Sequence, residues 1–247
     1  MPLSLIQPCS SRTFLMLFVS KLLLWEMVDS APMNVSEAAL SDDTLRILFD
    51  NATVLSNNLS DAALDLRSKL FTNSFSSALF MRIRKNLSKN EKIMATFSNN
   101  CHTAPISVPE TREEVIKTSF EDFLKIILNT LLAWKDPLKH LVTELSAMPK
   151  VPDAILSTAK ATEALNKNLL EHIMMIISKV NPAIEENGDY PVWSALDSLR
   201  SDNEETRFYA LYTFSYCLNM DLQILNFHVN LLRCLLVHSN LCYNSES

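Results

Sequence analysis

The sequence predicts an all-α protein: an up-up-down-down four-helix bundle with two long crossover loops. Three observations support this fold class. The 247 residues contain a single glycine, Gly188. Four long segments carry apolar residues at helical spacing, and the connections between them are long, short and long.

The near absence of glycine excludes several classes of protein. Average usage of about 7% would give roughly 17 glycines in a chain of this length. Phosphate-cradling loops, dinucleotide fingerprints and nucleophile elbows need glycine where the backbone turns with positive φ or approaches a ligand closely. Tight β-hairpins depend on similar turns, and the sequence offers only Asn187-Gly188. These exclusions leave a helical protein as the prediction.

Residues 1–30 are typical of a secretory signal peptide. Arg12 precedes an apolar stretch, residues 13–25, which Lys21 interrupts. The alternative is an uncleaved anchor helix. The interrupted stretch is too short to span a membrane comfortably, so we expect cleavage.

The predicted cleavage site precedes Ala31. Small residues, Val28 and Ser30, occupy the positions −3 and −1 of this site. Cleavage leaves one domain, residues 31–247, which is long enough to bury an adequate core.

The first amphipathic segment begins after Ser41, Asp42 and Asp43, which supply an N-cap and first-turn acids. One apolar stripe then recurs every three or four residues. Its members are Leu45, Leu48, Ala52, Leu55, Leu59, Ala62, Leu66 and Leu70. This spacing predicts the first helix.

The second segment is predicted to begin at a capping box formed by Thr111 and Glu114, whose side chains satisfy free backbone N–H groups. Pro137 should kink this helix, because proline removes one hydrogen bond and clashes with the preceding turn. The apolar pattern continues to about Met148. It consists of Ile116, Phe120, Phe123, Ile127, Leu131, Trp134, Leu138, Leu141, Val142 and Leu145.

The third helix is predicted from a cap at Asp153 to about Val180, and the fourth from a second capping box at Ser201 and Glu204. The fourth carries the most regular apolar stripe. Its members are Phe208, Leu211, Tyr212, Ser215, Leu218, Leu222, Leu225, Val229, Leu232 and Leu236.

Connection lengths predict the topology. Roughly 30 or more residues separate the first two helices, about five the second and third, and about 20 the last two. A short connection forces antiparallel neighbours, whereas a long one can run the length of a helix of about 40 Å and leave its neighbours parallel. Long–short–long therefore favours the up-up-down-down arrangement, which among four-helix bundles is that of the long-chain helical cytokine type.

Four cysteines follow the predicted signal peptide: Cys101, Cys217, Cys234 and Cys242. An even number in a secreted chain indicates two disulfides, for which three connectivities exist. Cys234 and Cys242 are close enough for a local loop. We expect no metal site, because the sequence has no Cys-x-x-Cys or His-x₃-His pair to begin one.

Four glycosylation sequons begin at Asn34, Asn51, Asn58 and Asn86. All of them precede residue 90, although most of the asparagines come later. Asn51 and Asn58 flank the apolar stripe of the first helix, so glycans there would stay outside the core.

The sequence predicts neither an enzyme nor a cofactor site. The five histidines, at 102, 140, 172, 228 and 238, are scattered and are interpreted as surface or interfacial side chains. No Ser/His/Asp spacing and no pair of Glu-x-x-His motifs is present. Acidic pairs lie at helix starts, where they complement the helix dipole.

The formal net charge of −6 gives no overall field for nucleic acid or anionic membranes. One basic cluster lies in the first crossover loop and consists of Arg82, Arg84, Lys85, Lys89 and Lys92. It could bind an acidic glycosaminoglycan such as heparan sulfate, or it could simply be a solvated loop.

Several stretches resemble the prolactin, growth hormone and placental lactogen family. Residues 122–145 are similar to the second helix of the family, 190–194 to the loop before its last helix, and 217–242 to its C-terminal end. The likeness covers about residues 48–242. It implies the four-helix hormone fold and the disulfide pairs Cys101 with Cys217 and Cys234 with Cys242.

The resemblance also implies a receptor-binding face on the first and fourth helices, and this chain departs from the lactogenic pattern there. Lactogenic members carry basic and histidine side chains where the fourth helix here has Met220, Gln223 and Ile224. They carry histidines where the first helix has Asn57 and Ser60. The better match is a non-lactogenic, placental prolactin-like hormone.

A second departure lies on the third helix. Prolactin has a glycine there that forms a notch for a second receptor, and this chain has His172. A bulky side chain should obstruct that contact. The alternatives are that this face is not used, or that another receptor accommodates the histidine.

We therefore expect a secreted, extracellular glycoprotein hormone that binds a class I cytokine-type receptor and signals through receptor-associated kinases, by the Janus kinase/STAT route. The alternative is an extracellular heparan-sulfate-binding or receptor-blocking prolactin-like protein. In either case we expect a monomer with no nucleic-acid partner and no stable membrane insertion after signal cleavage.

Overall fold

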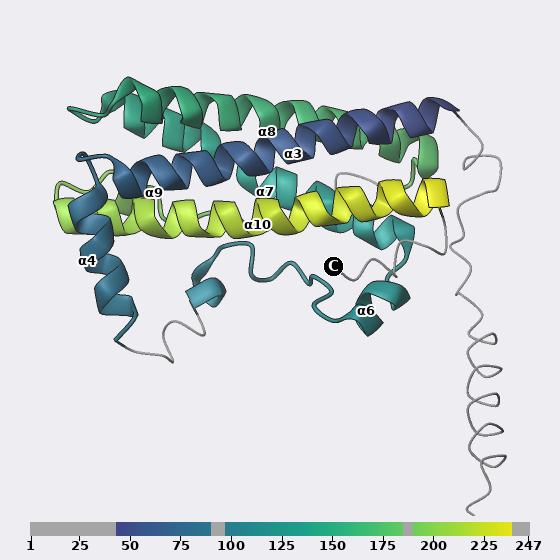
Figure 1. The fold of residues 1–247 in the computed structure, drawn as a ribbon, viewed down its shortest axis with the longest axis horizontal. Coiled ribbons are helices and arrows are strands. Elements are labelled where there is room, and N and C mark those ends of the chain that lie inside the picture. Colours follow the sequence, from purple (N-terminus) through teal and green to yellow (C-terminus); the bar gives the residue numbers. More distant parts are fainter. Residues whose placement is uncertain (1–42, 90–96, 185–189, 239–247) are drawn as a thin grey trace, which may run out of the picture. The chain divides into compact units, whose positions relative to one another are not determined.

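The computed structural model describes residues 43–89, 97–184 and 190–238. Four long helices dominate these residues: α3 (Asp43–Thr72), α7 (Phe120–Ala147), α8 (Asp153–Val180) and α10 (Glu204–His238) (Figure 1). The predicted signal peptide, Asn34, Ser41, Lys92, Gly188 and Cys242 lie outside the described residues.

The helix directions follow from contacts between helices. Late α3 contacts early α8 through Lys69 and Thr158, and early α3 contacts late α10 through Asp50 and Arg233. Early α7 likewise contacts late α8, because the Asn181 amide just after α8 donates to Glu121. Helices α3 and α7 therefore run in one direction, and α8 and α10 in the other (Figure 1). This is the predicted up-up-down-down arrangement.

The core is formed by most members of the apolar stripes that the sequence predicts, together with large aromatic side chains. Leu48, Leu55 and Ala62 of the first stripe are only partly buried. Phe49 of α3, Phe123 and Trp134 of α7, Ile173 of α8 and Leu218 of α10 are completely buried. Burying side chains of this size is the main favourable term in folding a bundle. Phe49 was not part of the predicted first stripe, although it lies one turn after Leu45 on the same face.

The first connection contains short helices that the sequence reasoning missed: α4 (Ser77–Leu87), the 3₁₀ helix Phe97–Asn100 and α6 (Arg112–Lys117). The interpretation of the basic segment as a loop is therefore wrong, since Arg82, Arg84 and Lys85 lie on α4. Phe80 fixes α4 to the bundle. Its ring is fully buried and contacts Phe71 and Tyr212.

The predicted start of the second long helix also needs correction. The capping box of Thr111 and Glu114 exists, but it caps the short helix α6. The chain is extended at Thr118, and α7 begins at Phe120 under a new cap, in which Ser119 accepts from the backbone N–H of Asp122. Ile116 is consequently 43% exposed and does not join the core.

Two other predicted caps differ in detail. Pro152 occupies the N-cap of α8 and Asp153 lies in its first turn. At α10 the side chain of Asn203 accepts from the backbone N–H of Thr206 at 3.0 Å, so the cap is a local asparagine rather than the predicted capping box. The asparagine thus satisfies the backbone N–H of Thr206, whereas the predicted box would have satisfied those of Ser201 and Glu204.

Helix α7 continues through Pro137. Proline has no N–H, so the carbonyl oxygen of Ala133, one turn earlier, lacks its helical donor. The His102 ring supplies the missing donor, because its Nε2 lies 3.0 Å from this oxygen. The proline is thus accommodated by a side chain from the first crossover.

Candidate functional site

The crossover segment 101–103 is fastened to α7 and α10 by a group of contacts that we call the latch. A disulfide joins Cys101 to Cys217 of α10 across a separation of 116 residues. Next to it, His102 bonds Ala133 of α7, and its ring contacts the edge of Trp134. The latch holds the crossover along α10.

Asp221 of α10 is the centre of the polar part of the latch. One of its carboxylate oxygens, Oδ2, accepts from the Thr103 hydroxyl at 2.6 Å and from the Trp134 indole N–H at 2.8 Å. Burial raises the pKa of this carboxyl to about 6, although both hydrogen bonds favour its charged form. Asp221 thus ties the crossover, α7 and α10 together.

His228 lies two turns further along α10 and is 1% exposed. Burial lowers its pKa to about 4, so the ring is neutral at pH 7. It packs against Phe123 of α7, with ring centroids 5.0 Å apart. The interpretation of this histidine as a surface or interfacial residue is therefore wrong. Its place on the side of α10 that faces α7 makes it a core residue.

The opposite side of α10 packs on α3. The Ser56 hydroxyl donates to the Asn226 amide oxygen at 2.8 Å, and the Arg233 guanidinium pairs with Asp50. Arg67 lies over the rings of Tyr212 and Tyr216, and burial lowers its pKa. Contacts along the whole length of the pair thus fix the position of α3 relative to α10.

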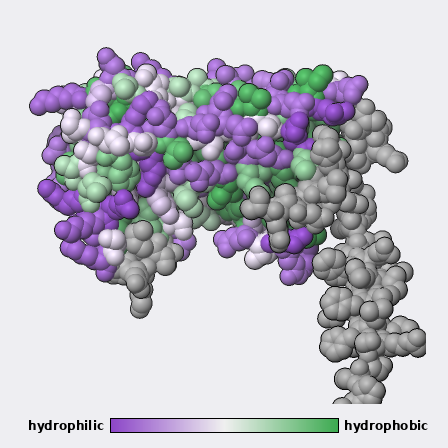
Figure 2. All heavy atoms as spheres, viewed as in Figure 1, coloured by the Kyte–Doolittle hydropathy of each residue, from purple (hydrophilic) through white to green (hydrophobic). Residues whose placement is uncertain are grey.

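Between these two sides α10 presents an outward surface, which we call the α10 face. It is formed by Met220, Gln223, Ile224 and Phe227, which recur every three or four residues. Phe227 is 56% exposed and Ile224 is 36% exposed. Figure 2 shows hydrophobic patches between hydrophilic side chains on the side of the molecule that it displays.

Three of the six predicted receptor-binding residues lie on this surface. Asn57 is exposed on α3, and Met220, Gln223 and Ile224 lie on the α10 face. Ser60 is only 9% exposed, so it belongs to the packing of α3 rather than to a contact surface.

Phe227 is the side chain that the sequence reasoning missed. It lies one turn after Gln223, and it falls outside the buried stripe that contains Leu225 and Val229. The sequence signal that could have identified Phe227 is a large aromatic residue that falls outside the buried stripe of an amphipathic helix. Singly exposed apolar residues are ordinary, but an exposed aromatic next to an exposed isoleucine is the composition of a contact surface.

His172 lies on α8, away from the α10 face. It is half-buried, and its Nδ1 hydrogen-bonds the backbone carbonyl of Asn168 at 2.9 Å. Met174 and Met175 beside it are exposed. The imidazole therefore stands at the surface position where the notch was expected.

The predicted basic cluster does not form one patch. Successive helical residues are about 100° apart, so Arg82 and Arg84 lie on opposite sides of α4. Arg82 pairs with Glu205 at 3.0 Å. Arg84 lies close enough to Arg67 of α3 to lower its pKa. Lys85 and Lys89 are exposed.

The described sequon asparagines, Asn51, Asn58 and Asn86, are all exposed. Cys234 is a disulfide-bonded cysteine, and its predicted partner, Cys242, lies outside the described residues.

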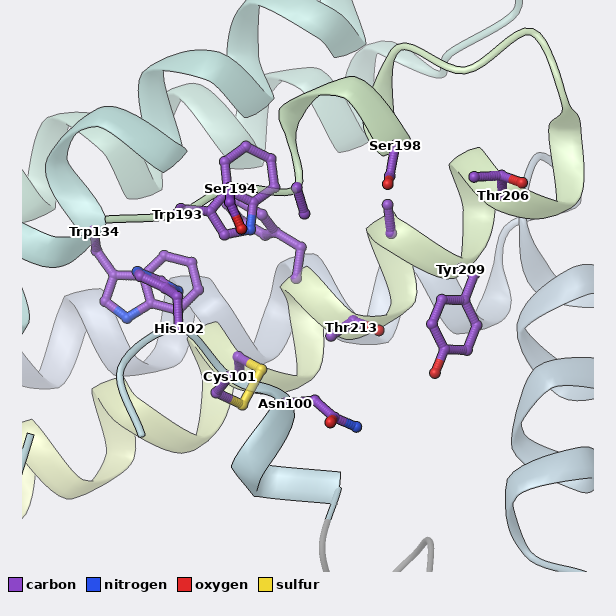
Figure 3. Close-up of a pocket in the computed structure, with 14 residues that line it drawn as sticks. Asn100, Cys101, His102, Trp134, Trp193, Ser194, Ser198, Thr206, Tyr209 and Thr213 are labelled. Atoms are coloured by element: carbon purple, nitrogen blue, oxygen red, sulfur yellow. A yellow bond between two sulfur atoms is a disulfide. The ribbon is translucent and has the colours of Figure 1, made fainter. Parts of the chain in front are cut away.

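A cavity of about 440 Å³ lies beside the latch, lined by the disulfide, His102, Trp134, Trp193 and Phe214 (Figure 3). The two tryptophans both contact the ring of Phe214. Within the described residues, no group of three or more His, Cys, Asp or Glu side chains could hold a metal ion. In the same part of the chain, no helix is both long enough and apolar enough to cross a membrane.

The fold, the latched crossover and the outward α10 face define a class of protein: the long-chain four-helix-bundle hormones and cytokines. Comparison with known proteins gives the family. The profile of the Somatotropin hormone family matches residues 17–242, so the chain belongs to the somatotropin hormone family. It is a member of a family of cytokine-type hormones, not of enzymes.

Among curated proteins, Prolactin-7D1 of Mus musculus is 60% identical over 241 residues, which are 98% of each chain. Prolactin-7C1 of Mus musculus is 44% identical over 242 residues, covering 98% of this chain and 96% of the relative. Prolactin-7B1 of Rattus norvegicus is 39% identical over 247 residues, covering 100% and 98%. These similarities confirm the resemblance to the prolactin family.

Proposed function

We propose that this protein is a secreted hormone that binds a class I cytokine-type receptor through the α10 face. The observation that carries the proposal is Phe227, more than half exposed, next to Ile224 on a helix fixed from both sides. Binding energy at protein interfaces is concentrated in a few aromatic or arginine anchors, and rigid presentation lowers the entropic cost of binding.

In this proposal the hormone acts by surface complementarity alone. Phe227 enters a pocket of the receptor, and Gln223 and Asn57 contribute polar contacts around it. The latch keeps the crossover beside α10, so that both meet the receptor as one surface. Receptor chains brought together in this way would activate their associated kinases through the Janus kinase/STAT route.

The test is a binding titration of the full, correctly disulfide-bonded chain against a panel of class I cytokine receptor ectodomains, the prolactin receptor included. The proposal expects specific, saturable binding to at least one ectodomain. If none binds specifically, the proposal fails.

His172 supports a proposal about stoichiometry. Its side chain occupies the surface of α8 at which a second receptor would need close approach, so the alternative to bringing receptor chains together is that the hormone engages one receptor chain and blocks it. His172→Gly should then raise the ratio of receptor to hormone from one-to-one towards two-to-one in light-scattering measurements. An unchanged ratio would dismiss this role.

Secretion, placental expression and glycosylation belong to the same proposal. They are supported by the sequence pattern of residues 1–30, by the similarity to the prolactin-7 proteins and by the exposure of Asn51, Asn58 and Asn86. We also propose the pairing of Cys234 with Cys242, a mature domain of residues 31–247 and a monomeric state. Peptide mapping of the secreted protein under non-reducing conditions tests the cleavage site, the sequons and the pairing together.

A second candidate function is retention on heparan sulfate. It is favoured by Lys85 and Lys89, which are exposed on one side of α4 and around its C-terminal end. Elution from heparin only at high salt, lost when these two lysines are neutralised but kept in Arg84→Gln, would support it. Release at physiological salt would reject it.

A further inference from the structure

A groove of about 540 Å³ lies between α4 and the first turns of α10. Leu79, Ile83 and Tyr209 provide its apolar part, and Arg82 and Glu205 provide its charged part. Its volume is within the range of small-ligand sites, roughly 300–1,000 Å³. Asn86, the asparagine of a sequon, is also one of its lining residues.

We propose that this groove is a carbohydrate-binding site and that its occupant is the N-linked glycan on Asn86. The inference rests on the glycosylation of Asn86, which belongs to the proposed function. It goes further by giving this glycan a fixed position, and with it a structural role.

Helical spacing places the attachment point inside the groove. Leu79, Arg82, Ile83 and Asn86 are separated by three, one and three residues, so all four lie on one side of α4. This is the side that faces α10, because Arg82 pairs there with Glu205. A sugar linked to Asn86 therefore begins between the two walls of the groove.

The chemistry of the lining suits a neutral sugar. Tyr209 is 44% exposed, and its ring offers the electron-rich face on which the C–H groups of a pyranose ring stack. Arg82 and Glu205 form an ion pair 3.0 Å long, and both side chains are largely exposed. Together they offer donors and acceptors to sugar hydroxyls without a net charge, which does not favour a sulfated or phosphorylated ligand.

The groove continues beyond the reach of the first sugar. Tyr209 and Thr206 line both the groove and the cavity next to the disulfide. In Figure 3 these two residues stand at the end of the cavity away from Trp134 and His102. A branched glycan that follows Tyr209 would come next to a second aromatic surface, formed by Trp193 and Phe214.

The consequence is that the glycan fastens α4, and the crossover that contains it, to the start of α10. Asn58 is the matched control, because it is an exposed sequon asparagine in the middle of α3, whereas the walls of the groove come from α4 and α10. A glycan on Asn58 has no such site.

The experiment is a double-mutant cycle on the full chain secreted from mammalian cells, with the occupancy of each sequon measured by mass spectrometry. The variants are Asn86→Gln, Tyr209→Ala and the double variant, beside the same cycle with Asn58→Gln. We expect Asn86→Gln to lower Tm by roughly 2–4 °C, the shift typical of losing one good contact in a domain of this size. In the Tyr209→Ala background this shift should disappear.

Two controls identify the glycan as the cause. Asn58→Gln should shift Tm equally with and without Tyr209→Ala. Asn86→Gln should have no effect on protein made in bacteria and refolded, because that protein has no glycan to lose.

The outcomes separate this inference from the proposed function. If mass spectrometry finds Asn86 unoccupied, both the glycosylation of this site and the inference fail. If Asn86 is occupied but its effect on Tm is the same in both Tyr209 backgrounds, the glycosylation stands and the inference fails. The groove would instead be assigned to a protein partner if the Tm shifts were additive in this way and Tyr209→Ala either bound the receptor more weakly or associated with itself more weakly than wild type.

Discussion

Replacing Asp221 with asparagine tests the electrostatics of the latch. Asparagine has nearly the same shape, and its oxygen can accept from both Thr103 and Trp134, so the contacts of the latch persist. What disappears is the buried charge. The pKa of Asp221 is raised from 3.8 to about 6. The folded state therefore binds this proton more tightly than the unfolded state, so the stability that depends on the protonated carboxyl is lost as the pH rises from about 3.8 to about 6.

The magnitude follows from linkage between protonation and folding. A shift of about two pKa units corresponds to about 3 kcal/mol. Asp221→Asn should thus raise the free energy of unfolding at pH 7 by up to about 3 kcal/mol and leave it nearly unchanged below about pH 3, where the carboxyl is mostly protonated in both states.

His228 acts in the opposite direction over almost the same range of pH. Its pKa is lowered from 6.5 to about 4, so the stability it gives by being buried neutral is lost as the pH falls from 6.5 to 4. That loss is also about 3 kcal/mol. The two groups nearly cancel in the wild-type protein. Asp221→Asn should therefore make the protein clearly less stable at pH 4 than at pH 7.

The assay is urea unfolding of wild type, Asp221→Asn and His228→Gln at pH 7 and pH 4, with disulfides intact. His228→Gln is the control with the opposite expected result. It removes the group that destabilises the protein on acidification and keeps Asp221, so this variant should be more stable at pH 4 than at pH 7. If Asp221→Asn is less stable than wild type at pH 7, or if its stability does not fall between pH 7 and pH 4, the reasoning is refuted.

Three further predictions follow from the latch and the basic segment. His102→Ala should destabilise the protein by about 1–3 kcal/mol, because it leaves the Ala133 carbonyl without a donor. The loss should be much smaller in a Pro137→Ala background, where a backbone N–H is restored, and equal losses in both backgrounds in urea titrations would contradict this account. The free energy of unfolding of the double variant Cys101→Ala with Cys217→Ala should be lower by about 2–5 kcal/mol, because the variant opens a loop of 116 residues. An unchanged urea midpoint would contradict this, because it would show that the polar contacts hold the crossover without the disulfide. Replacing both Lys85 and Lys89 with glutamine should lower the salt concentration at which the protein elutes from heparin. Arg84→Gln should not lower it, since Arg84 lies on the opposite side of α4. A larger effect of Arg84→Gln than of the double lysine variant would contradict the proposal that the lysine side of α4 binds heparin.

The main features of the fold were predictable from the sequence because they depend on local patterns. Leu45, Leu59 and Leu66 repeat at helical spacing, and each is buried as the stripe predicts. The lengths of the connections were sufficient to predict the helix directions. These features depend only on how often apolar residues recur and how far a chain can reach.

The errors occurred where two local signals competed. The box of Thr111 and Glu114 is a genuine helix start, yet the helix that it begins ends at Lys117 and another starts at Phe120. In the same way, the segment around Arg82 has polar residues typical of a loop, but the burial of Phe80 stabilises it as a helix. In both cases tertiary packing decided between alternatives that the sequence permits.

The candidate site was only partly predictable. The resemblance located the receptor-binding face on the first and fourth helices, and the structure keeps Gln223 and Ile224 exposed there. It could not show that Ser60 is used in packing, or that Asp221 joins Thr103 to Trp134, because these facts depend on contacts between residues far apart in the sequence. Phe227 could have been found from the helical pattern alone.

The central claim is that the α10 face binds the receptor. Its most direct test compares wild type, Phe227→Ala and Met174→Ala for binding to the receptor ectodomain that the titration identifies. Met174 is the control because it is a comparably exposed apolar residue on α8. The account predicts that Phe227→Ala weakens binding by about 10-fold or more and that Met174→Ala binds as wild type does. Unchanged binding by Phe227→Ala, with its folding intact, would contradict the claim.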